Sequence, residues 1–403
     1  MDSLTQMVLG AAVAEAALGK KVGNRAMVWG AIAGTIPDLD VIANFFMEPV
    51  DALAFHRGPT HSALYCTLLA VLMGILVHRM YRLPYHRWFG AVGWSLLMLL
   101  VGTAIIFAGG ITLTKAVTGS LIIGLSAWTI MKRYHRPSYD TPQAGVSGWI
   151  WMFFLALVTH PILDCFTTYG TQILLPFSDR RVAFNNISVA DPAYTMPFLT
   201  CLIIAMFYSR TDRRRHTWVR RGLIISSAYM IFTFFNKSRV NTVFENSLSH
   251  QKVNYTRYMT TPTILNNILW SGIAETDSAY YYGSYSFFDS EKEFKLTKMP
   301  KERTGLETAL THDPTLKTMR WFSDDFFALK QKDSTHYEYY DLRFGTFRIK
   351  KDSPDQFVFR FNMIRKPDGS FYLKDQGERP RDADFSEAFP VLWDRIKGKT
   401  QAL

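Results

Sequence analysis

The chain has 403 residues, 48% of them hydrophobic, and a formal net charge of +11 at pH 7. Its length allows two or more domains, and the apolar residues are concentrated before about residue 235. Much of the positive charge lies in short loops between apolar runs, and residues 236–403 are nearly balanced, so the composition argues against a nucleic-acid partner. The three cysteines stand in or beside apolar segments without CxxC spacing, which favours small buried residues over a disulfide framework or a zinc knuckle.

The first half of the chain consists of long apolar segments. A membrane-spanning helix needs roughly 20 mainly apolar residues. The sequence therefore predicts a polytopic α-helical membrane domain over residues 1–235, with about six to eight membrane segments. They are 4–19, 26–46, 62–78, 88–110, 113–131, 149–175, 192–208 and 222–235, of which the first two are the weakest by composition.

Four basic clusters lie in the loops, and two predicted segments separate each cluster from the next. Short loops rich in lysine and arginine stay on the cytoplasmic side of a membrane. The alternation predicts that residues 47–61, 176–191 and the chain after 235 lie on the outer side. The clusters are Lys20, Lys21 and Arg25; Arg79, Arg82 and Arg87; Lys132, Arg133 and Arg136; and the run from Arg210 to Arg221.

Residues 236–403 have the pattern of a soluble α+β domain with an antiparallel sheet. An amphipathic helix is expected over 237–251, with further helices near 303–322 and 384–397. Alternating aromatic runs such as HYEYYDLRFGTFRI and FVFRFNMI predict at least four strands, and Asp368–Gly369 marks a hairpin turn. The tyrosines suit a stacking platform for sugars or bases, but we interpret them as the aromatic core faces of strands.

Ionisable side chains inside membrane segments are costly and are therefore candidates for function. Glu15 stands in the small-residue stretch GAAVAEAALG, which permits close helix packing and requires a partner for the carboxylate. Asp38 and Asp40 stand in GTIPDLD near the outer end of the second segment. Pro37 breaks the helix there, which would leave both carboxylates on irregular backbone that lines a cavity.

Two further motifs contain histidines at the predicted outer face. In HRGPTH, Gly58 and Pro59 make a continuous helix unlikely, so a turn could bring His56 and His61 toward one ion, with Arg57 or Arg180 binding an anion. In VTHPILD, His160 and Asp164 stand four residues apart on one helix face, the spacing of a metal-chelating pair. Pro161 favours a helix start at that point.

The ordered motifs MDSLTQMVLGAAVAEAALG, GAIAGTIPDLD, HRGPTHS and THPILDCFTTYGTQ resemble the membrane-bound metal-dependent hydrolase family, also described as LexA-binding, inner-membrane-associated hydrolases. The resemblance covers residues 1–235 and implies a bacterial inner-membrane protein with a divalent-metal centre. Some relatives have a Thr-His pair where this chain has Thr5–Gln6. The site residues that the resemblance implies are Asp38, Asp40, His56, His61, His160 and Asp164.

We therefore expect an inner-membrane hydrolase that cleaves an ester or phosphoester of a lipid or lipid-linked substrate at the outer leaflet. Asp38, His56, His61, His160 and Asp164 are the expected ligands of a divalent ion, with zinc preferred. Asp40, Glu15 and Arg57 are the expected catalytic groups, as base or anion-binding residues. A transporter or a non-catalytic metal-binding membrane protein is the alternative, since buried carboxylates on broken helices also occur in transporters.

Overall fold

The computed structural model describes residues 1–107, 112–134, 142–301, 305–348, 356–375 and 385–399. Helices dominate the first 250 residues, and the strands all follow. The helices are α1 (Ser3–Val22), α2 (Asn24–Thr35), η1 (Pro37–Phe45), α3 (Pro49–Phe55), η2 (Pro59–His61), α4 (Ala63–Arg82), α5 (His86–Phe107), α6 (Leu113–Tyr134), α7 (Val146–Asp164), α8 (Pro192–Met206), α9 (Arg213–His250), α10 (Glu307–His312), α11 (Pro314–Phe322) and α12 (Phe385–Ile396).

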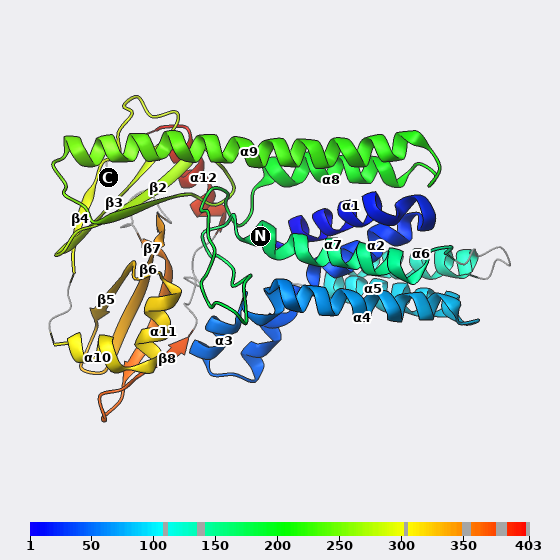
Figure 1. The fold of residues 1–403 in the computed structure, drawn as a ribbon, viewed down its shortest axis with the longest axis horizontal. Coiled ribbons are helices and arrows are strands. Elements are labelled where there is room, and N and C mark those ends of the chain that lie inside the picture. Colours follow the sequence, from blue (N-terminus) through cyan, green and yellow to red (C-terminus); the bar gives the residue numbers. More distant parts are fainter. Residues whose placement is uncertain (108–111, 135–141, 302–304, 349–355, 376–384, 400–403) are drawn as a thin grey trace.

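The helices of the first half lie side by side as a bundle (Figure 1). Within the described residues, four helices are long and apolar enough to cross a membrane, namely α4, α5, α6 and α7. The bent pair of α2 and η1 makes a fifth if it is counted as one span. The predicted count of six to eight is not confirmed, because α1 and α8 do not meet the same criteria and segment 222–235 is part of a longer polar helix.

The basic clusters lie together at one end of the bundle. The last turns of α1 and α4 carry the basic pairs Lys20 and Lys21, and Arg79 and Arg82, and α9 begins at Arg213. These helix ends lie at the end of the bundle remote from the strands (Figure 1). Arg136 falls outside the described residues. The motifs with Asp38, His61 and His160 belong to the opposite end, as the alternation of the loops predicts.

Helix α9 has 38 residues and runs without a break from the basic end of the bundle into the C-terminal half (Figure 1). The predicted domain boundary at 235 therefore lies inside a helix, and the amphipathic helix expected over 237–251 is its second part. Its buried residues Val240, Phe244 and Leu248 pack on the first sheet. Gly272 of that sheet faces the Phe244 ring, where a Cβ atom would overlap the aromatic carbons.

The C-terminal half contains two antiparallel sheets of four strands each, in the orders β1-β2-β3-β4 and β5-β6-β7-β8. The antiparallel sheet domain is thus confirmed, although it consists of two sheets rather than one. The Asp368–Gly369 turn joins β7 to β8, with Gly369 at a φ of 86°. The strands are β1 (Arg257–Pro262), β2 (Leu269–Glu275), β3 (Ala279–Ser286), β4 (Thr297–Pro300), β5 (Phe327–Gln331), β6 (His336–Phe347), β7 (Gln356–Arg365) and β8 (Phe371–Asp375).

The two halves meet at the end of the bundle that carries the motifs. Leu53 of α3 and Tyr169 of the loop after α7 belong to the same apolar cluster as Leu316 and Phe322 of α11. The hydroxyl groups of Thr168 and Thr261 are also hydrogen-bonded across the junction. The second sheet and its helices therefore lie directly beside the segments that carry the polar motifs.

Candidate metal centre

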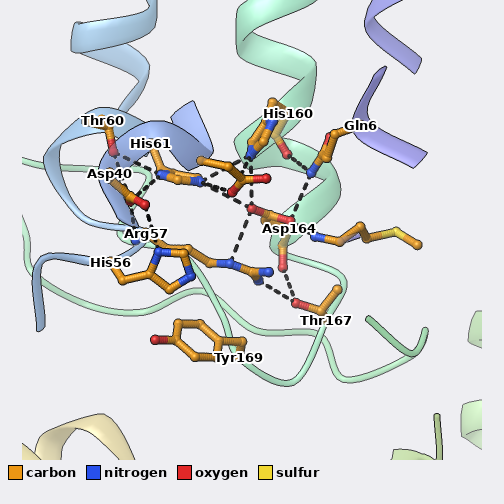
Figure 2. A network of polar contacts seen from close by, with 12 residues as sticks. Gln6, Asp40, His56, Arg57, Thr60, His61, His160, Asp164, Thr167 and Tyr169 are labelled. Carbon is orange, nitrogen blue, oxygen red and sulfur yellow. Dashed lines mark hydrogen bonds and ion pairs between the residues drawn. The ribbon is translucent and has the colours of Figure 1, made fainter. Parts of the chain in front are cut away.

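Four side chains from three separate segments converge at this end of the bundle, and Figure 2 shows three of them, His61, His160 and Asp164. Asp38 comes from η1, His61 from η2, and His160 and Asp164 from the last turn of α7. One ligand atom from each lies within 4.8 Å of the other three. His61, His160 and Asp164 are buried, and only Asp38 is partly exposed. The arrangement could hold one metal ion, since histidine nitrogens and carboxylate oxygens are common ligands of zinc and related ions.

Helix α7 supplies two of these groups, and it continues through Pro161 rather than beginning there. Because proline has no N–H, the Leu157 carbonyl has no helical partner; the Cys66 thiol lies 3.6 Å from it and donates to it. His160 Nε2 and Asp164 Oδ2 are 3.4 Å apart, as expected for residues one turn apart on the same face.

Helices α1 and α2 pack closely together, and the end of α2 orients His160 of α7 through a backbone carbonyl. Cβ atoms at Gly10 or Gly34 would overlap backbone of the facing helix, so the small residues are required for this contact. The Gly34 carbonyl lies 2.6 Å from His160 Nδ1. A carbonyl only accepts, so Nδ1 carries the proton and the Nε2 lone pair faces the cluster, as in metal-ligating histidines held by an outer partner.

His61 is held in the same way by Asp40. Its Nδ1 lies 3.4 Å from Asp40 Oδ2, and its Nε2 lies 3.1 Å from His160 Nε2. The Asp40 carboxylate is buried and also accepts from the Arg57 backbone N–H at 2.9 Å and from the Thr60 hydroxyl at 3.1 Å. Asp40 therefore lies behind His61 as an orienting carboxylate, outside the four ligands.

Asp164 provides the test of whether these residues fit a metal ion. Its Oδ1 accepts from Gln6 Nε2 at 3.0 Å and is also contacted by the amino group of Met1. Its Oδ2 is buried and makes no hydrogen bond with the described residues. That oxygen lies 3.4–3.5 Å from the two histidine Nε2 atoms and from Arg57 Nε, and a buried carboxylate oxygen without a hydrogen bond favours a cation. The donor set and this oxygen both fit a cation.

The electrostatic environment of His61 also favours positive charge. Burial lowers the pKa of the imidazole, but hydrogen bonds to Asp164, Asp38 and Asp40 outweigh burial and raise the pKa to about 10. Three carboxylates therefore face two imidazoles, and Asp164 is also paired with the Arg57 guanidinium and the Met1 amino group. The site concentrates charged groups of both signs in a largely buried position.

His56, the fifth predicted ligand, lies outside the four-residue cluster. Its Nδ1 is 2.8 Å from Asp40 Oδ1, and its ring centroid is 6.3 Å from that of His61. The His56 side chain is 28% exposed, more than any of the four ligands. His56 and Asp40 thus form a hydrogen-bonded dyad at the rim of the cluster, an arrangement typical of proton transfer.

Arg57 lies beside the cluster with a φ of 59°, a sparsely populated conformation for a residue other than glycine. Its Nε is 3.5 Å from Asp164 Oδ2, and its Nη1 donates to the Thr167 hydroxyl at 3.0 Å. The guanidinium lies 4.8 Å from the centroid of the Tyr169 ring (Figure 2). Of the two arginines proposed for anions, Arg57 is at the site; Arg180 forms no ion pair within the described ranges.

The neighbouring Arg181 has a different position. Its guanidinium lies 4.6, 5.3 and 5.0 Å from the rings of Tyr169, Trp321 and Phe322, and it donates to the Tyr169 carbonyl at 2.9 Å. No carboxylate pairs with Arg181 in the part of the chain described, and burial lowers its pKa to about 10. Arg181 therefore joins the loop after α7 to α11.

Glu15 is not brought to the cluster. It forms a buried two-point ion pair with Arg215 of α9, with Nε–Oε1 and Nη2–Oε2 distances of 2.6 Å. Glu15 stands nine residues after Gln6 on α1, roughly 13 Å along the helix at 1.5 Å per residue. The predicted catalytic role required proximity to the site, and the geometry instead gives Glu15 a packing role at the basic end.

Sequence reasoning did not assign Gln6, Thr167, Tyr169 or Arg181 to the site. Gln6 occupies the position where some relatives have histidine, which was the available signal. Thr167 and Tyr169 stand inside the motif THPILDCFTTYGTQ, but neutral hydroxyl and aromatic residues are too common to stand out. Arg181 becomes visible only when α11 lies against the loop.

The fold and the cluster define a multi-spanning membrane protein that carries a buried histidine–carboxylate centre at one end of its helical bundle. The chain belongs to the YdjM inner membrane protein family, whose model matches residues 1–109 and 112–240. It is also similar to the uncharacterized protein YfhP of Bacillus subtilis (strain 168), with 39% identity over 64 residues. That match spans 16% of this chain and 19% of the relative. No solved structure matches the chain.

Proposed function

We propose that the protein is a metal-dependent hydrolase that cleaves an ester or phosphoester of a lipid or lipid-linked substrate at the outer face of the inner membrane. The observation that carries this proposal is the cluster of Asp38, His61, His160 and Asp164, in which one Asp164 oxygen lacks a hydrogen bond among the described residues. When bound there, a divalent ion, with zinc preferred, would supply Lewis-acid polarisation of the substrate and would lower the pKa of a water molecule.

Three residues beside the cluster, His56, Asp40 and Arg57, carry out proton transfer, orientation and anion binding. His56 accepts and returns the proton, because its Nδ1 is engaged by Asp40 and its Nε2 forms no hydrogen bond within the described chain. Asp40 holds the tautomers of both His56 and His61. Arg57 binds an anionic group next to the cluster, since its guanidinium presents a planar fork suited to phosphate or carboxylate.

A lipid substrate is supported by the surface beside Asp38 and Asp40. The same short helix, η1, exposes a row of apolar side chains, which a bilayer would cover. A lipid that diffuses laterally would meet these side chains before it meets the carboxylates. The exposed residues of this row are Leu39, Val41, Ile42 and Phe45, and the exposed Phe46 follows the helix directly.

The outer location is supported by the basic residues at the opposite end of the bundle. An alkaline phosphatase fusion after residue 260 should be active, and a green fluorescent protein fusion at the same point should be dark. The reverse pattern would put the strands and the cluster on the cytoplasmic side, and it would exclude an outer-leaflet substrate.

The direct test is elemental analysis of the detergent-purified protein combined with a screen of ester and phosphoester lipids. We expect one divalent ion per chain and turnover of at least one lipid class, both lost in His160→Ala. His56→Gln should keep the ion and lose turnover. Bound metal without turnover in any lipid class, together with metal flux into proteoliposomes, would instead favour a transporter.

A further inference from the structure

One face of α9 changes from apolar to polar along its length. Ile224, Ile231 and Phe235 form an exposed apolar row on this face, which a bilayer would cover. The next residues on the same face are Ser238 and Arg239, which are also exposed. Arg239 stands about 6 Å beyond Phe235 along the axis at 1.5 Å per residue, and the headgroup region of a bilayer is roughly 5–7 Å thick. The surface of the bilayer therefore lies close to Arg239.

The first sheet meets α9 at this level through its edge nearest the bundle. Asn236 of α9 donates to Asn267, just before β2, at 2.9 Å. The Arg239 guanidinium lies 5.2 Å from the centroid of the Phe287 ring, in the turn that follows β3. The next residue, Phe288, is 62% exposed. A large apolar side chain is therefore exposed at the level where α9 enters the headgroup region. The turn, which we call the sheet rim, comprises Phe287, Phe288 and Asp289.

Helix α12 packs on the sheet rim and exposes two more aromatic rings. The Arg395 guanidinium nitrogens lie 2.6 and 2.8 Å from the two carboxylate oxygens of Asp289, so the helix is fixed to the rim. Phe389 and Trp393 are exposed one turn apart, with ring centroids 6.3 Å from each other. Lys397 Nζ lies 5.0 Å from the Trp393 ring. The helix stands between the strands and the bundle (Figure 1), and exposed aromatic rings beside a lysine are typical of a membrane interface.

We propose that the sheet rim and α12 dock on the surface of the protein's own bilayer, at the end of the bundle that carries the metal cluster. Phe288 and Trp393 enter the interface, and Arg239 and Lys397 reach the lipid phosphates. Lipid is the occupant because α9 runs without a break from its apolar row to the rim, so the two surfaces are continuous. The contact is separate from the metal centre and does not depend on hydrolysis.

Fluorescence quenching of the full chain in nanodiscs of phosphatidylethanolamine and phosphatidylglycerol tests this contact. The native cysteines are buried, so a bimane label can be attached to Phe288→Cys, where its apolar ring replaces the phenyl group. Ser278→Cys is the matched control, since Ser278 is exposed at the opposite end of β3.

We expect lipids with a headgroup nitroxide to quench the label at position 288 at least three-fold more strongly than at 278, and aqueous iodide to quench it at least three-fold less. Equal quenching at the two positions would overturn the proposal. Protection from iodide without quenching by the nitroxide lipid would also overturn it, because protein, such as a second copy of the chain, would then cover the rim.

A second substitution tests the part that α12 takes in the contact. Trp393→Glu, combined with the labelled Phe288→Cys, should reduce quenching by the nitroxide lipid at least two-fold, because a carboxylate is repelled by anionic headgroups and does not enter the interface. Trp393→Phe keeps an aromatic ring and should retain the quenching. Unchanged quenching in Trp393→Glu, with unchanged thermal stability, would contradict the docking of α12.

Discussion

Helix α1 is in contact with two buried charged groups that differ in kind. Near its basic end, Glu15 and Arg215 are each only 1% exposed and satisfy each other at two points, and Arg215 Nη1 also donates to Asn24 and to the Tyr208 carbonyl. Near its other end, Gln6 contacts Asp164, which keeps one oxygen without a hydrogen bond among the described residues. The first group is satisfied by its own hydrogen bonds, whereas the second leaves a buried carboxylate oxygen without one.

The difference separates a structural charge from a binding site. Both groups obey the rule that ionisable residues in membrane segments are expensive. A saturated ion pair has no capacity left for a ligand, and its removal should affect stability. The metal cluster instead presents histidine nitrogens and carboxylate oxygens that can bind a ligand. Removal of these side chains should therefore affect metal binding. The following changes test that distinction, in order of decreasing effect.

Glu15→Ala should cost the most stability, because it leaves Arg215 buried without a counter-charge. Breaking one partner of a buried ion pair typically costs about 3–5 kcal/mol. Thermal unfolding in detergent should show a large loss, and the charge-free pair Glu15→Leu/Arg215→Met should recover most of it. Loss of bound metal with unchanged stability would instead return Glu15 to the catalytic role that the sequence suggested.

His61→Ala should abolish stoichiometric metal binding while leaving membrane insertion intact, because the apolar helices do not depend on the cluster. A ligand that binds only the folded state stabilises it, by about 2.7 kcal/mol at a hundred times its Kd. A chelator should therefore lower the melting temperature of the unaltered protein but not that of His61→Ala. Equal metal content in both proteins, measured by elemental analysis, would remove His61 from the site.

Asp40→Asn should weaken metal binding by roughly 10–100-fold, the usual effect of losing a residue that orients a ligand. His56→Gln is the matched control, since His56 contacts the same carboxylate but lies outside the four ligands. Its metal affinity should not change. Competition with a fluorescent chelator measures both affinities, and an equal loss in the two variants would place His56 among the ligands.

Arg181→Met should have the smallest effect, about 1–2 kcal/mol, from the lost cation–π contacts and hydrogen bonds. Arg181→Lys should retain part of that stability. Limited proteolysis near the loop after α7 should become faster in Arg181→Met, because that loop loses its connection to α11. An unaltered cleavage rate would mean that Thr168, Thr261 and the apolar cluster hold the junction without Arg181.

The apolar segments and the alternating aromatic runs were sufficient to predict a helical membrane half followed by an antiparallel sheet domain. The periodicity of apolar residues indicates which face of a helix or strand is buried, and this information is contained in a short stretch of sequence. The number of spans is not confirmed, because α1 and α8 do not combine the length and the hydropathy of a spanning helix. Periodicity also could not reveal that 222–235 continues into the C-terminal half as one helix.

The sequence by itself determined which polar residues had to be explained, since Asp38, His61, His160 and Asp164 each stand where an unpaired polar group is costly. Only the tertiary structure decided which of the candidates share a site. Asp40 lies behind His61, His56 lies at the rim, and Glu15 pairs with an arginine 200 positions later in the chain. The physical reason is that the cost of burying a charge depends on its partner, and partners distant in sequence become neighbours only when the helices pack.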